Sequence, residues 1–94
     1  MKVLTSVNIA YPDEFYRALH GFNRRPFGEL HCLEQVDDDS HNIIYLIFDW
    51  DSVQNARQFW TSAPGRAHVA AWKSVREPNF VYLRDRPIAG GVSG

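Results

Sequence analysis

Six side chains of this sequence have types suited to an active site or a ligand site. Imidazole groups titrate near neutral pH, so they can act as general bases or bind a metal ion. Amide and phenol groups orient a polar ligand, and indole rings form an apolar wall that excludes water. The six candidates are Asn8, His31, Tyr45, Trp60, His68 and Trp72. They lie on four different expected elements, so their chemistry depends on whether the fold brings them together.

His68 is the strongest of the three candidate catalytic residues. It follows the Pro64-Gly65 dipeptide, which is expected to interrupt a helix and to leave a short helical segment after it. We predict that His68 acts as a base and that Asn8 and His31 are polar anchors for the ligand. The alternatives are that His68 is a half-exposed surface residue, that Asn8 ends its strand, and that His31 faces a dimer contact.

The three aromatic candidates are predicted to bind the ligand. Trp60 and Trp72 would form the cavity wall, and the hydroxyl of Tyr45 would orient a phenolic group. Large aromatic residues at helical positions usually serve packing, so a role in the core is the alternative for both tryptophans. The strand position of Tyr45 also suits a dimer contact.

Other enzyme motifs are missing from the sequence. There is no glycine-rich phosphate loop, no Gly-x-Ser-x-Gly elbow, and no paired Cys or His-x-x-x-His spacing. Cys32 reads as a small buried hydrophobe. The run Asp37 to Asp39 reads as a solvated turn. We therefore predict no metal site and no bound cofactor.

Charge and composition exclude further classes of protein. The 94 residues suffice for one domain, and 10 basic against 11 acidic residues give a net charge of -1. The basic residues are scattered, which argues against nucleic-acid binding. A single cysteine and an amino terminus without the apolar core of a signal peptide indicate the cytoplasm. The longest apolar run, Ile43 to Phe48, is too short to cross a membrane.

The first half of the chain predicts a strand, a helix and a strand. Residues 2–9 are rich in β-branched types and end before a turn at Tyr11-Pro12. Residues 12–24 have proline at the start, acidic residues in the first turn and apolar residues at helical spacing. Residues 27–36 then alternate as a strand does.

The second half predicts a strand, an interrupted helix and a strand. Residues 43–50 form the clearest strand, and Asp51 or Ser52 is expected to cap the helix that follows. After Pro64-Gly65 a shorter helical segment covers about residues 65–74, and residues 79–85 alternate as a final strand. Residues 87–94 contain three glycines and read as a flexible tail.

This order predicts a single α+β domain over residues 1–86, with the ferredoxin-like βαββαβ arrangement. A four-stranded antiparallel sheet would carry two helices on one face. Residues 43–48 are apolar toward both faces of the sheet, so the face without helices is expected to be covered too. A second copy packed sheet to sheet would cover it by symmetry, and we predict a homodimer.

The run from Ile43 to Phe59, the break Ser62-Ala63-Pro64 and the stretch Glu77 to Leu83 resemble the small dimeric α+β barrel proteins of the antibiotic biosynthesis monooxygenase type. The resemblance covers the second half of the chain closely and the first half only in element order. It implies a homodimeric barrel with a ligand cavity between sheet and helices in each subunit.

The resemblance also implies a set of functions. The first is a cofactor-independent monooxygenase or cyclase that acts on a small aromatic, polyketide-like or quinol compound. The alternative is a non-catalytic dimeric protein that binds a small ligand or serves as an accessory protein. A minority alternative is haem degradation, because Asn8, Trp60 and His68 follow the order of the haem-contacting residues in that branch. Their spacing departs from it, since Phe59 occupies the position expected for the tryptophan.

Overall fold

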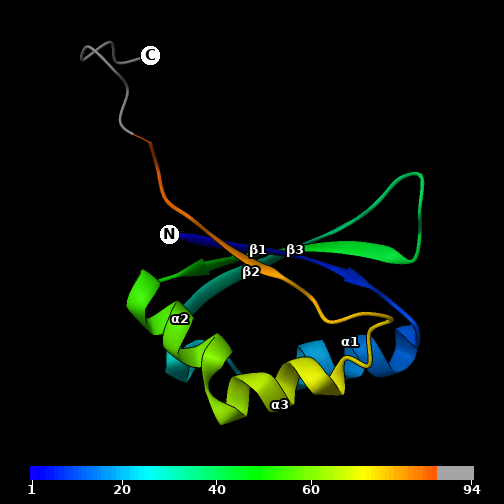
Figure 1. Cartoon of the computed structure of the whole chain (residues 1–94), viewed down its shortest axis with the longest axis horizontal. Coiled ribbons are helices and arrows are strands. Elements are labelled where there is room, and N and C mark those ends of the chain that lie inside the picture. The colour runs from blue at the N-terminus through cyan, green and yellow to red at the C-terminus, as the bar shows by residue number, and fades with distance from the viewer. Residues whose placement is uncertain (87–94) are drawn as a thin grey trace.

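A computed structural model describes residues 1–86 as two layers, a four-stranded antiparallel sheet and a layer of helices (Figure 1). The strands pair in the order β2-β3-β1-β4. The bounds are β1 Lys2–Asn8, α1 Pro12–Gly21, η1 Arg25–Phe27, β2 Glu29–Val36, β3 Ile43–Trp50, α2 Val53–Thr61, α3 Ala63–Ala71 and β4 Phe80–Leu83. The predicted ferredoxin-like α+β fold is confirmed. The predicted tail, residues 87–94, lies outside the described residues.

Helix α1 ends three residues earlier than predicted. Pro12 stands in its first turn, and the helix stops at Gly21. The short 3-10 helix η1 follows; Arg25 and Pro26 were expected between the first helix and the next strand, and Phe27 in that strand. Gly28 ends η1 with a φ of 121°, a value that glycine tolerates and most residues do not. This early end turns the side chain of Arg24 into the interior.

Ser62, and not Pro64, divides the second helix. Its hydroxyl group donates a hydrogen bond to the Phe59 carbonyl oxygen at 2.6 Å, and the hydroxyl oxygen, Oγ, caps α3 by accepting from the Gly65 amide. Pro64 lies in the first turn of α3, where no helix hydrogen bond is lost. A Cβ atom on Gly65 would lie 1.9 Å from the Phe59 carbonyl oxygen, so only glycine allows α2 and α3 to approach this closely.

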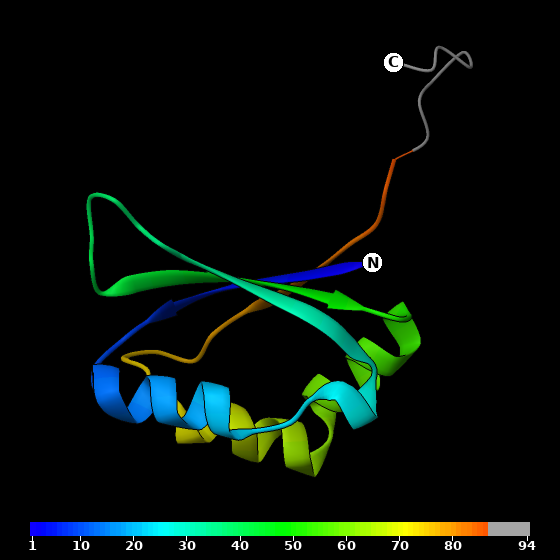
Figure 2. The ribbon, with the colours of Figure 1, turned by 180° about the vertical axis from the view of Figure 1, so that it is seen from behind.

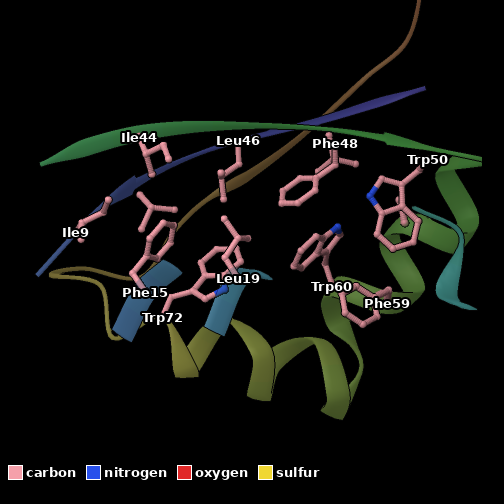
Figure 3. Packing of buried hydrophobic residues seen from close by; sticks show 13 residues of the cluster. Ile9, Phe15, Leu19, Ile44, Leu46, Phe48, Trp50, Phe59, Trp60 and Trp72 are labelled. Carbon is pink, nitrogen blue, oxygen red and sulfur yellow. The ribbon is translucent and has the colours of Figure 1, made fainter. Parts of the chain in front are cut away.

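The core lies between the sheet and the helices (Figures 2 and 3). Phe48 and Trp50 of β3 face Phe59 and Trp60 of α2, while Trp72 packs edge to face on Phe15 of α1. One continuous cluster of buried residues joins β1, β3, α1 and α2 with Trp72, which follows α3. Its other buried members are Val3, Val7, Ile9, Leu19, Ile44, Leu46 and Ala56.

The opposite face of the sheet carries an apolar row. Strand pairing aligns Leu33 of β2 with Ile47 of β3, Leu4 of β1 and Val81 of β4. Leu33 and Val81 at the two ends of this row are each 43% exposed. We call this surface the outer face. None of the helices within residues 1–86 is long and apolar enough to cross a lipid bilayer.

Candidate functional site

Helix α3 carries His68 into the core, where it is only 4% exposed. Arg24 donates a hydrogen bond from Nη1 to His68 Nε2 at 3.0 Å. A guanidinium group has no acceptor atom, so Nε2 must accept, and the proton of the neutral ring is on Nδ1. Burial first, and then the charge of Arg24, lower the pKa of His68 from 6.5 to about 4. The imidazole is therefore neutral near pH 7, and Arg24 occupies its basic nitrogen.

Arg24 is the centre of this polar group and is itself buried. Its Nε donates to Glu29 Oε2 of β2, and Nη1 also donates to the Leu19 carbonyl oxygen at 2.9 Å. The guanidinium carbon lies 5.1 Å from the ring centroid of Phe48. We call Arg24, Glu29 and His68 the Arg24 cluster. It links the end of α1, the start of β2 and the middle of α3.

Aromatic rings enclose His68. Phe22 stacks on the imidazole with 4.4 Å between centroids, Trp60 lies nearly parallel at 6.2 Å, and Trp72 meets it edge-on at 5.3 Å. The other edge of the imidazole reaches a shallow groove of about 420 Å³ between α1 and α3. These contacts hold His68 as part of the packing.

A hollow of about 820 Å³ lies on the other side of α3. It separates α2 and α3 from the segment that leaves α3 and returns to the sheet as β4, which is yellow to orange in Figure 1. We call it the Trp60 cavity. It is lined by Trp60, Thr61, Arg66, Ala67, Val69, Ala70, Lys73, Ser74, Val75, Arg76, Glu77, Pro78 and Phe80.

One wall of the Trp60 cavity is aromatic and the rim is mainly basic. Trp60 and Phe80 stack with 4.4 Å between ring centroids. The lining includes three basic residues, Arg66, Lys73 and Arg76, and one acidic residue, Glu77. Flat apolar rings next to cationic groups suit a planar aromatic compound with acidic or electron-rich oxygen atoms.

The six predicted site residues divide between the two faces of the sheet. His68, Trp60 and Trp72 come together in the helix layer. The indole nitrogens of both tryptophans are buried without a hydrogen-bond partner among the described residues, and in Figure 3 that of Trp60 points toward the sheet. The two rings therefore act mainly as packing, although Trp60 also lines the cavity.

Asn8, His31 and Tyr45 do not join them. Strand alternation and pairing place all three on the outer face, away from the helices. The backbone oxygen of Asn8 accepts from the Val75 amide at 2.9 Å, and the Tyr45 hydroxyl donates to Asp37 Oδ2 at 3.3 Å. The convergence of four elements on one cavity, for which these residue types were suited, does not occur within residues 1–86.

Sequence reasoning missed Arg24, Glu29, Arg66, Arg76 and Phe80. Arg24 and Arg25 form a pair of charges that reads as a surface feature. The apolar residues on either side of the pair, Phe22 and Phe27, stack at 6.0 Å and were the only signal that one arginine turns inward.

The haem alternative does not fit these residues. The Arg24 hydrogen bond occupies His68 Nε2, and a stack of aromatic rings fills the space beside the imidazole. Asn8 lies on the opposite face of the sheet. Within residues 1–86, no three His, Cys, Asp or Glu side chains are grouped so that they could hold a metal ion.

Comparison with known proteins shows which solved structures share this fold. No family model matches the sequence, and no curated protein matches it significantly. A presumed antibiotic biosynthesis monooxygenase from Bordetella bronchiseptica superposes with a TM-score of 0.72 at 14% identity, over 92% of this chain and 96% of the other. A conserved protein from Methanosarcina mazei gives 0.70 at 12% identity, over 90% and 91%.

The structure of SnoaB, a cofactor-independent oxygenase from Streptomyces nogalater, gives a TM-score of 0.66 at 16% identity, over 90% of this chain and 93% of SnoaB. Several further matching structures carry the name antibiotic biosynthesis monooxygenase. The predicted resemblance to these proteins is therefore confirmed. At identities this low, the likeness shows a shared fold.

Proposed function

We propose that this chain is a cofactor-independent monooxygenase or cyclase that binds a small, flat, hydroxylated aromatic compound in the Trp60 cavity. The observation that carries the proposal is the cavity itself, about 820 Å³ with an aromatic wall and a basic rim. That volume falls within the range of small-molecule sites. The fold shared with SnoaB, which is named a cofactor-independent oxygenase, supports the same reaction class.

The geometry changes the roles first expected for the site residues. Phe80, which stacks on the buried Trp60 ring, forms the wall against which a planar ring packs. His68 does not line this cavity, and its basic nitrogen already accepts from Arg24. We therefore assign His68 to holding Arg24 and the Trp60 ring in place. We assign no role in this cavity to Asn8, His31 and Tyr45, because they lie on the outer face.

Oxygenation of such a compound needs no bound redox group. The electron-rich anion of a hydroxylated anthrone reacts directly with O₂. Its methylene carbon becomes a carbonyl, one oxygen atom enters the product, and the other leaves as water with the two methylene hydrogens. The protein then has to bind the anion, orient it and exclude water from it.

The binding site is tested by filling the cavity from α3. Ala70 is exposed and lines the Trp60 cavity, whereas its exposed neighbour Ala71 lines the groove on the other side of the helix. We expect Ala70→Trp to weaken binding of dithranol, a hydroxylated anthrone, at least about tenfold, or ~1.4 kcal/mol. Ala71→Trp should leave it unchanged. Tryptophan fluorescence measures binding, and an oxygen electrode measures turnover. Equal affinities in both variants would show that the ligand binds elsewhere.

A second function, ligand binding without catalysis, is favoured by one specific observation. His68, which lies beside Trp60 of the cavity wall, has a pKa lowered to about 4 and a basic nitrogen that already accepts from Arg24. Dithranol binding that Ala70→Trp removes, without protein-dependent oxygen consumption, would establish this alternative in place of the enzyme.

We further propose that two copies pair through their outer faces. The apolar row ending in Leu33 and Val81 supports this, because those side chains stay 43% exposed in one copy. We expect a dimer in sedimentation equilibrium, and Leu33→Glu should raise its dissociation constant at least about tenfold. Gln54→Glu, on an exposed position of α2, is the control. A wild-type chain that remains monomeric at high concentration would contradict the proposal.

A further inference from the structure

We propose that the Trp60 cavity binds its aromatic ligand as the phenolate, and that Arg66 and Arg76 supply the charge that selects this form. This inference rests on the proposed function and adds to it the two residues that select the anionic form of the ligand. The ligand class is then an acidic hydroxyaromatic compound, which loses its phenolic proton to water when it binds.

The charge around the cavity is the first support. Three basic side chains and one acidic side chain line it, whereas the whole chain has a net charge of -1. Lys73 already forms an ion pair, because its Nζ lies 2.8 Å from Glu14 Oε2 on α1. Within residues 1–86, no carboxylate forms an ion pair with Arg66 or Arg76. Their charges are available to a ligand anion.

The surroundings of these charges are the second support. A ligand packed against Phe80, with Trp60 behind it, would be partly removed from water beside the apolar side chains of Val69 and Val75. Charges interact more strongly in such a medium than in bulk water, so each guanidinium group would lower the pKa of a bound phenol. Arginine keeps its charge throughout the accessible pH range, so the effect does not depend on an auxiliary proton acceptor.

The missing base is the third support. A phenol must become an electron-rich anion before it can react with O₂ or attack a carbonyl carbon in a cyclisation. His68 has its basic nitrogen engaged by Arg24 and lies outside the cavity lining. Stabilising the anion by fixed positive charge gives the same reactive species without a residue that takes the proton.

The probe for this inference is p-nitrophenol, whose phenolate absorbs visible light and whose neutral form does not. We expect wild-type protein to bind the phenolate about tenfold more tightly than the phenol, which lowers the pKa of the bound probe by about one unit. Arg66→Gln and Arg76→Gln should each reduce this preference to about threefold, and the double variant should abolish it. Arg57→Gln is the matched control, since Arg57 is exposed on α2 and lies over the Tyr82 ring outside the cavity lining.

The uncharged analogue p-nitroanisole separates this inference from the proposed function. If p-nitroanisole binds and Ala70→Trp blocks it, while p-nitrophenol binds equally in both protonation states, the cavity stands and the phenolate inference is overturned. If neither probe binds, both proposals fail. Circular dichroism and thermal unfolding of the arginine variants test whether the fold is kept. Both side chains are exposed, so we expect the variants to fold as the wild type does.

Discussion

Replacing Arg24 with methionine is expected to lower the free energy of unfolding by about 3 to 5 kcal/mol. The guanidinium group pairs with Glu29 and donates to the Leu19 carbonyl oxygen and to His68 Nε2. Methionine fills a similar volume but leaves a buried carboxylate and two buried acceptors without their donor. Because small domains are stable by roughly 5 to 15 kcal/mol, this loss approaches the limit for folding. Urea denaturation measures it.

Two further variants identify the cause of this loss. Arg25→Met changes the neighbouring residue, which is exposed, and should change stability by less than about 0.5 kcal/mol. The double variant Arg24→Met with Glu29→Gln should recover part of the stability, since it no longer buries an uncompensated charge. A single variant Arg24→Met as stable as the wild type would show that the buried pair contributes nothing.

The fold follows from the sequence because its signals are local and repeated. The alternation in residues 43–50 and the apolar spacing in residues 12–22 determine element type without knowledge of tertiary contacts. The limits of elements were less predictable. The low helix propensity of proline predicts a helix break at Pro64. The first turn of a helix accepts proline, however, and the break lies at Ser62, which caps α3.

The candidate site was harder to predict because β3 is apolar toward both faces. Ile44, Leu46 and Phe48 alternate with Ile43, Tyr45 and Ile47, so the pattern separates two faces without showing which one meets the helices. Tyr45, with Asn8 and His31 on neighbouring strands, falls on the face away from them. Hydrophobic alternation alone does not distinguish a face covered by helices from one covered by another subunit.

Arg24 shows a second limit of sequence patterns. Its burial depends on contacts with residues 5 and 44 positions away, Glu29 and His68. A charged residue next to another charge is normally exposed, and only this set of long-range partners offsets the cost of removing it from water. The same contact decides the chemistry of His68. The sequence predicts His68 to be a base, and the contact with the buried guanidinium group of Arg24 overrides this prediction.

The pH dependence of stability gives the second large effect. The pKa of His68 is lowered to about 4 in the folded chain, from 6.5 when it is free of these contacts. Above pH 6.5 neither state binds this proton, so the full stability is present. Between pH 6.5 and 4 the unfolded chain binds the proton and the folded chain does not, so stability falls as the pH falls. Below about pH 4 both states are protonated, and this group causes no further loss.

We expect the loss across this window to be roughly 2 to 3 kcal/mol, measured by urea denaturation in steps of pH. His68→Gln is the matched variant, because a glutamine side-chain oxygen can accept from Arg24 but does not titrate. Its stability should change less over the same window. The half-buried residues Glu14, Asp37 and Asp49 have carboxylates with lowered pKa values, so their contribution is lost at the acid end in both proteins and cancels in the difference. Parallel curves for wild type and variant would mean that protonation of His68 does not oppose folding, and that the imidazole remains available as a base.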